Sequence, residues 1–97
     1  MRQLIYTVRA TDDLDAIWEY TYDNWGLDQE ERYVRDLRAV CQALALRKRI
    51  GRTTTMRRGY LSCPCGQHVI WYRDLPDRLE VIRILHSAQD TGRHLHD

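Results

Sequence analysis

The sequence predicts an α+β domain in which a helical hairpin packs on one face of a mainly antiparallel sheet. The first observation is a change of period: apolar residues recur at helical spacing through the first half of the chain, and alternate with polar ones from about Met56 onward. The second is the shortness of the links between segments, which favours an antiparallel helix pair followed by a strand meander. With a short N-terminal strand, these segments give the order β-α-α-β-β-β in a single domain spanning residues 1–97.

The chain opens with a short strand and a first helix. Alternation from Leu4 to Val8 indicates the strand. Thr11 and Asp12 are typical helix N-caps, and Asp13 suits the positive end of a helix. Gly26 would end this helix. Its apolar face is predicted to lie mostly in the core and consists of Leu14, Ile17, Trp18, Tyr22 and Trp25.

A second helix follows closely. Asp28 and Glu31 have the spacing of a capping box. The basic residues 47–49 suit the negative C-terminal end of a helix, and Gly51 would stop it. The predicted apolar stripe is Tyr33, Leu37, Val40, Cys41 and Leu44.

Three strands complete the chain. We predict them at Met56–Ser62, Gln67–Arg73 and Leu79–His86. The segment Cys63–Gly66 is predicted to be a turn, because proline fixes φ and glycine tolerates positive φ. A second turn is expected around Pro76.

Composition excludes several classes of protein. The chain has no apolar run long enough to span a membrane, and its first residues lack the pattern of an export signal. The odd cysteine count (Cys41, Cys63 and Cys65) argues against a disulfide framework and favours a reducing, cytoplasmic location. Cys-x-Cys spacing with His68 nearby is a weak pattern for zinc, so we expect no metal.

Charge is unevenly distributed although the net charge is only +1. Residues 37–73 contain eight bases and no acid, whereas the segments before and after them contain more acids than bases. Such a positive segment attracts phosphates or an acidic protein partner, or is simply solvated.

An ordered set of short motifs resembles the ParE toxins of the RelE/ParE superfamily. The set covers about nine-tenths of the chain without large gaps. It consists of Ile17-Trp18-Glu19-Tyr20, Asn24-Trp25-Gly26, Ile50-Gly51-Arg52, Arg58-Gly59-Tyr60, the strand from Gly66 to Arg73, and the strand from Glu80 to His86.

This resemblance implies the poison half of a type II toxin–antitoxin pair. ParE toxins are thought to bind DNA gyrase and trap it on cleaved DNA, a protein–protein inhibition without toxin chemistry or a cofactor. A ParD-like antitoxin would neutralise the toxin in a hetero-oligomer by folding an acidic segment onto it. Direct sequence-specific DNA binding by the toxin alone is not expected. A binding module without toxicity remains a further possibility.

The superfamily also offers an enzymatic alternative, a ribosome-dependent messenger RNA endoribonuclease of the RelE type. Cleavage would require a base for the 2′-hydroxyl and a cation for the phosphorane. In principle these roles could be supplied by Arg57, Arg58, Arg73, Arg83 and His86, with Arg83 and His86 as the catalytic candidates. Three residues apart on a regular strand, these side chains point to opposite faces. The resemblance also makes hydrogen bonding within the fold the favoured interpretation of both, because ParE toxins carry a similar Arg-Ile-Leu-His and are thought not to be nucleases.

Antitoxin or target binding is expected to use aromatic and cationic side chains. Aromatic residues are frequent hot spots, and cations would attract an acidic partner. The predicted binding residues are Trp18, Tyr22, Arg57, Arg58, Tyr60, Trp71 and Arg73.

Overall fold

A mixed, five-stranded sheet forms one layer of the fold. The computed structural model describes residues 2–53 and 59–88, without the side chains of residues 22, 24, 25 and 27–30. The strands lie in the order β1-β5-β4-β3-β2, with β1 parallel to β5 and the other pairs antiparallel. This confirms the predicted, mainly antiparallel sheet. The strands are β1 (Gln3–Tyr6), β2 (Arg52–Thr53), β3 (Leu61–Cys65), β4 (His68–Asp74) and β5 (Arg78–His86).

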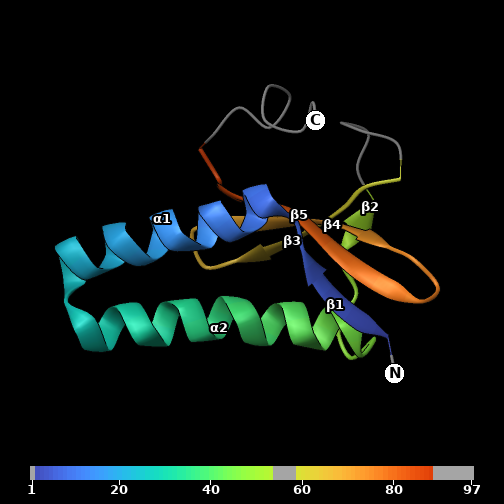
Figure 1. Cartoon of the computed structure of the whole chain (residues 1–97), viewed down its shortest axis with the longest axis horizontal. Coiled ribbons are helices and arrows are strands. Elements are labelled where there is room, and N and C mark those ends of the chain that lie inside the picture. Colours follow the sequence, from blue (N-terminus) through green and yellow to red (C-terminus); the bar gives the residue numbers. More distant parts are fainter. Residues whose placement is uncertain (1, 54–58, 89–97) are drawn as a thin grey trace.

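Two antiparallel helices, α1 (Val8–Trp25) and α2 (Leu27–Ala45), form the second layer (Figure 1). Gly26 links them with a φ of 88°, a conformation that glycine adopts at little cost. The main core lies between the helices and the sheet, which confirms the predicted α+β architecture. Its largest fully buried side chains include Leu37 and Leu44 of α2, Ile70 of β4, and Leu79 and Val81 of β5. Within the described residues, neither helix is long and apolar enough to cross a membrane.

The first helix begins earlier than the sequence predicted. Thr7, rather than Thr11 or Asp12, caps it, because the Thr7 hydroxyl accepts a hydrogen bond of 3.1 Å from the Ala10 amide. Val8 consequently lies in the first helical turn, exposed, and not at the end of the first strand. The prediction failed because several residues here are good caps and the strand pattern was too short to choose between them.

The second helix also begins and ends earlier in the sequence than predicted. It starts directly after Gly26, so that Asp28 lies inside the helix and does not precede it as a cap. It ends at Ala45, and the basic residues 47–49 follow the helix and do not form its last turn. The amides of Leu46 and Arg47 bond back to α2 carbonyls, and Arg47 adopts a positive φ of 60°.

The region between α2 and β4 also differs from prediction. Residues 56–58 of the expected strand lie outside the described residues, and β3 starts only at Leu61. Cys63–Cys65 belongs to β3, and the turn is at Gly66-Gln67. Proline is tolerated in this strand because β2 pairs with β3 only up to Ser62, so that Pro64 lies on an open edge where a missing N–H removes no ladder bond.

Gly51 has a packing role instead of the predicted helix-stopping role. Its amide donates a hydrogen bond of 2.8 Å to the Tyr72 hydroxyl. A Cβ atom at this position would lie 2.5 Å from that hydroxyl and from the Ser62 carbonyl oxygen. A glycine therefore lets the segment before β2 approach the sheet closely.

The sheet face opposite the helices carries a second, smaller apolar cluster. Alternation along β4 and β5 sends Trp71 and Leu85 to this face, where they pack with Tyr60. A β-bulge at Ile82 adds one residue to β5 relative to β4. Ile82 therefore also packs against this cluster.

Candidate protein-interaction surface

Arg83 is held inside the fold by an ion pair with Asp13. Its Nε and Nη2 atoms donate to the two carboxylate oxygens at 2.8 and 2.9 Å, and the Ile84 amide donates to the same carboxylate at 2.9 Å. The contact forms because β1 ends at Tyr6 and leaves the β5 edge open beyond Val81, where α1 presents Asp13. Asp13 therefore closes a strand edge and is not the helix-start acid that the sequence predicted.

His86 belongs to a separate cluster with His68 and Tyr33. The two histidines are register partners on β5 and β4, with ring centroids 5.4 Å apart. The Tyr33 hydroxyl accepts a hydrogen bond from the Gln67 amide and shares a second hydrogen bond, of 2.5 Å, with His68 Nδ1. Burial, and then the neighbouring His86, lowers the pKa of His68, while burial raises the pKa of Tyr33. His68 is therefore neutral at physiological pH.

These histidines line a hollow of about 250 Å³ between the sheet and α1. Ala16, Ile17 and Tyr20 of α1 and Gln67 form the rest of its lining. Among the residues that the structure describes, no lysine or arginine lines this hollow. The structure thus does not bring Arg83 and His86 together around one phosphate.

Two aromatic side chains of α1 are exposed. Trp18 has 42% of its surface exposed and Tyr20 has 64%, so Trp18 is not the core residue that helical spacing suggested. The neighbouring Ile17 occupies the core position. The side chain of Tyr22 lies outside the described part. Sequence reasoning missed Tyr20 because it falls off the apolar stripe, although an aromatic residue on the polar face of an amphipathic helix is itself a signal.

The other predicted binding residues lie in different environments. Tyr60 and Trp71 are buried in the second apolar cluster, and the Trp71 Nε1 atom has no hydrogen-bond acceptor among the described residues. Arg73 is exposed, with one Nη atom 3.4 Å from a Glu80 carboxylate oxygen. Arg57 and Arg58 lie outside the described residues. Among the four predicted residues whose side chains are described, Tyr60 and Trp71 lie together in one cluster.

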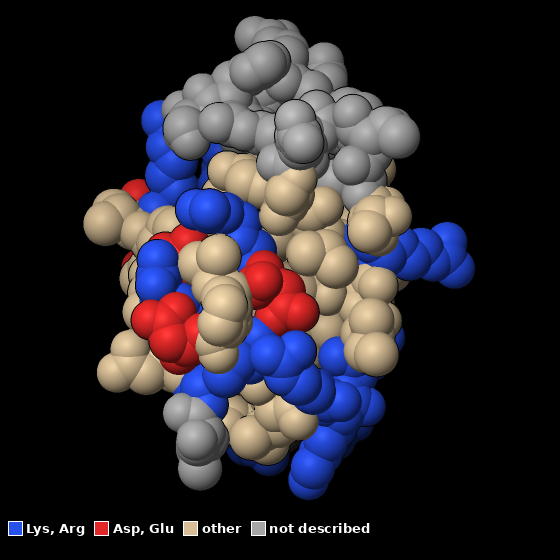
Figure 2. Space-filling model, turned by 90° about the vertical axis from the view of Figure 1, so that its right-hand side faces the viewer, with Lys and Arg blue, Asp and Glu red and all other residues tan. Residues whose placement is uncertain are grey.

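Basic side chains gather at the end of the molecule where α2 stops and β4 turns into β5. Figure 2 shows Lys and Arg over much of this end, with acidic side chains between them. Exposed ion pairs join some of these charges, including Arg78 with Asp77 at 3.1 Å and Arg73 with Glu80. Such pairs contribute roughly 0–1 kcal/mol each, so this surface keeps its capacity for an external partner.

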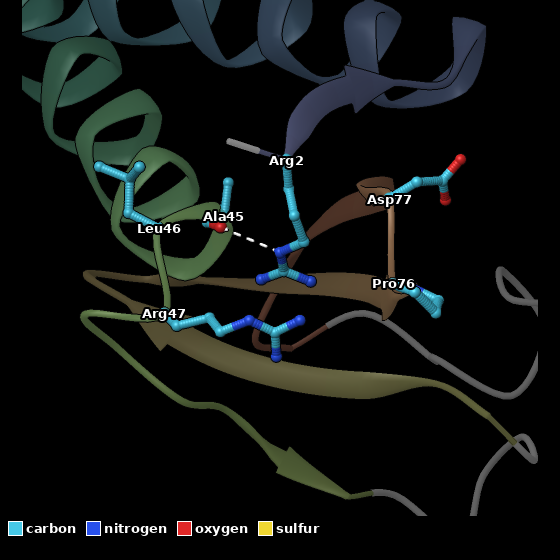
Figure 3. Close-up of a pocket in the computed structure, with 6 residues that line it drawn as sticks. All are labelled: Arg2, Ala45, Leu46, Arg47, Pro76 and Asp77. Carbon is cyan, nitrogen blue, oxygen red and sulfur yellow. Dashed lines mark hydrogen bonds between the residues drawn. The ribbon is translucent and has the colours of Figure 1, made fainter.

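Residues 46–52, which we name the Arg47 segment, project from this end. Two hollows adjoin it. The larger, of about 520 Å³, is lined by Arg2, Ala45, Leu46, Arg47, Pro76 and Asp77 (Figure 3). The smaller, of about 120 Å³, is lined by Leu44, Arg47, Arg49, Ile50, Tyr72 and Asp74.

Arg2 and Arg47 have different roles at the larger hollow. Figure 3 shows both guanidinium groups extending into it, one from the residue just before β1 and one from the segment after α2. Arg2 donates to the carbonyl oxygens of Leu44 and Ala45 at 3.0 and 3.1 Å and pairs with Asp74, so it caps the C-terminus of α2. The Arg47 side chain is 61% exposed, and its Nη1 atom lies 3.9 Å from an Asp74 carboxylate oxygen, which is a long and weak ion pair.

Arg47 is also strained. A non-glycine residue at φ 60° costs about 1 kcal/mol, whereas an exposed ion pair at 3.9 Å offsets less than about 0.5 kcal/mol. The arginine side chain therefore does not offset its strain through contacts inside the described chain. Sequence reasoning found the positive segment but not this conformation, because several residues after α2 are equally compatible with a helix end.

The three thiols face the core between α2 and β3. Cys41 and Cys63 are buried and Cys65 is half-buried. Burial raises the pKa of Cys41 to about 11, which keeps this thiol protonated and unreactive. The described residues contain no group of three or more side chains arranged to hold a metal ion.

Comparison with solved structures places this architecture among known toxin folds. A chain of the chromosomal ParDE TA system from P. aeruginosa superposes with a TM-score of 0.76 at 21% identity, covering 89% of this chain and 96% of the other. The E. coli DinJ-YafQ complex matches with a TM-score of 0.67 at 12% identity, covering 91% and 96%. The YoeB/ParE toxin from Agrobacterium tumefaciens matches with a TM-score of 0.58 at 22% identity, covering 87% and 96%. The shared fold is two helices packed on a mixed, open sheet.

Sequence comparison identifies the family. Residues 4–91 match the family described as the ParE toxin of the type II toxin-antitoxin system parDE. Toxin ParE1 of Caulobacter vibrioides is 39% identical over 88 residues, which are 90% of this chain and 91% of the relative. Toxin ParE1 of Mycobacterium tuberculosis is 39% identical over 84 residues, or 84% and 86% of the two chains. This chain therefore belongs to the ParE toxin family and is a ParE-type toxin of a type II toxin–antitoxin system.

Proposed function

We propose that this toxin acts by binding and inhibiting DNA gyrase, and that a ParD-like antitoxin neutralises it in a hetero-oligomer in the cytoplasm. Membership of a family named for the parDE system supports the antitoxin partner. The solved ParDE system and the DinJ-YafQ complex support a partner-binding role for the shared fold. On this proposal the toxin is not an enzyme, and it needs no cofactor.

The engagement of Arg83 by Asp13 is the observation that most favours binding over catalysis. Two hydrogen bonds direct the guanidinium at a carboxylate of its own chain. Inhibition by binding requires exposed, complementary side chains and no reactive group. Trp18 and Arg73 meet that requirement, and Tyr20 adds a second exposed aromatic residue to the same helix as Trp18.

The histidine cluster favours a second candidate function, ribosome-dependent cleavage of messenger RNA. A neutral His68 with a lowered pKa is able to accept a proton from a 2′-hydroxyl, and His86 lies beside it. This mechanism lacks a nearby cation among the described residues that line the hollow. We therefore place it second.

The proposal is tested by expressing the toxin in cells and measuring the DNA-damage response and protein synthesis in parallel. Gyrase poisoning should induce the DNA-damage response while protein synthesis continues at first. The double variant His68→Gln, His86→Gln should retain toxicity, since the proposed binding does not use these side chains. Early arrest of translation with messenger RNA cut at the ribosomal A site, abolished in that folded double variant, would establish the nuclease instead.

A further inference from the structure

The Arg47 segment combines positive charge with exposed apolar side chains. Arg47, Lys48, Arg49 and Arg52 are all exposed. Ile50, in the middle of them, has 83% of its surface exposed, and Leu46 is also among the exposed large apolar residues. Each of these two apolar side chains lines one of the hollows that flank Arg47. Apolar groups concentrated in this way on a charged loop mark an interaction surface.

The backbone around Arg47 adds an independent argument. Its positive φ is a position where glycine would be more stable, and its side chain has no short ion pair among the described residues. Strained residues of this kind concentrate at functional sites. Gly51, with its tight approach to Tyr72 and Ser62, fixes the far end of the segment against the sheet. The segment is thus held in one shape and presents Arg47 between two hollows.

We propose that the Arg47 segment is a docking site for an acidic protein segment that also carries apolar side chains. A partner carboxylate would pair with Arg47 at the larger hollow, and partner apolar side chains would cover Ile50 and Leu46. Charge complementarity supports this occupant, because residues 46–53 contain four cations and no acid. Asp74 and Asp77 line the hollows and disfavour the dense charge of a nucleic acid backbone.

This inference rests on the proposed antitoxin partner for the source of the acidic segment, and it does not depend on gyrase being the target. Failure of antitoxin capture and failure of the titration below are separate outcomes. The test is a titration of the full-length, isotope-labelled chain, followed by NMR of its backbone amides. The probe is a short blocked peptide of alternating glutamate and leucine. The same peptide with glutamine in place of glutamate, and a short DNA duplex, serve as comparison ligands. We expect the acidic peptide to shift the amides of residues 46–52 and of Asp77.

Three variants make the test specific. Arg47→Gly should weaken peptide binding about fivefold without loss of folding, since glycine fits the backbone there. Ile50→Ser should weaken it as well, and Arg35→Gln, which removes an exposed cation from the middle of α2, should leave it unchanged. Equal binding of the glutamine peptide, or no shift in residues 46–52, would overturn the proposal. Tighter binding of the duplex, insensitive to Ile50→Ser, would show a nucleic acid surface instead.

Discussion

Arg47 is the residue at which backbone energy and side-chain chemistry conflict most clearly. Glycine would satisfy the left-handed backbone after α2, but the chain has an arginine whose nearest acid lies 3.9 Å away. We predict that Arg47→Gly raises the free energy of unfolding by about 0.5–1 kcal/mol, because it relieves strain and removes only a weak ion pair. Urea denaturation of both proteins measures this. A destabilised variant would mean that the arginine makes a stronger contact than the described structure shows.

Asp13 and Arg83 make a second residue-level claim, that Arg83 is structural. Asp13→Ala would leave a mostly buried guanidinium and the Ile84 amide without their acceptor, so we expect a loss of about 2–3 kcal/mol. Arg83→Ala should cost a similar amount, and the double variant less than the sum. Toxicity should fall in each case only as far as the folded fraction falls. If Arg83 were catalytic, Arg83→Ala would abolish toxicity in a fully folded protein, whereas Asp13→Ala would spare it.

Tyr33, His68 and His86 couple α2, β4 and β5 through a group that titrates. Because the pKa of His68 is lowered in the folded protein, the unfolded chain binds the proton at a higher pH than the folded one. Stability conferred by neutral His68 is therefore present above the ordinary histidine pKa of about 6.5 and declines as pH falls below it. Denaturant unfolding across this range should show the decline, and His68→Gln should flatten it. An identical pH profile in the variant would show that other groups dominate.

The elements differ in how far the sequence could predict them. Helical periodicity identified the core positions Leu14, Leu37 and Leu44, because burial on one face imposes a repeat that the sequence must carry. Boundaries were less predictable: Thr7 and Thr11 are both capable caps, and only the β1–β5 pairing decides which one is used. The turn before β4 was predicted to begin too early, at Cys63, because Pro64 is typical of a turn but is also compatible with an open strand edge.

The candidate site was less predictable than the core, for a physical reason. Hydrogen bonding of Arg83 within the fold was expected, but its partner Asp13 lies 70 positions away in the sequence and only the folded chain brings the two together. Trp18 has the spacing of a core residue, yet 42% of its surface is exposed. Tyr20 and the strained Arg47 were not found at all, because exposure and φ are properties of the packed molecule.

The outer surface of α1 yields a prediction for the toxin–antitoxin complex as a whole. Co-expression with the neighbouring antitoxin gene, followed by affinity capture, should recover both proteins together. Trp18→Ala should weaken this complex by about tenfold or more, as expected for an aromatic hot spot, while the thermal midpoint changes little. Val8→Ala is the matched control, since Val8 is an exposed apolar residue on the same helix. Equal loss of binding in both variants would refute a specific role for Trp18.

The molecule as a whole is a compact two-layer toxin domain whose described side chains favour binding over catalysis. The Arg83 guanidinium forms an ion pair with Asp13. Among the described residues, no cation lines the hollow that contains the two histidines. Aromatic and basic side chains are exposed on the surface. These features accord with a protein that inhibits its target by docking to it.

A gyrase DNA-cleavage assay tests that central claim most directly. Purified toxin, gyrase and supercoiled plasmid should yield linear, cleaved DNA trapped with gyrase, in proportion to toxin concentration. Addition of the cognate antitoxin should abolish the effect, and His68→Gln with His86→Gln should leave it intact. Gyrase activity untouched by the toxin, together with messenger RNA cleavage on purified ribosomes, would contradict the account.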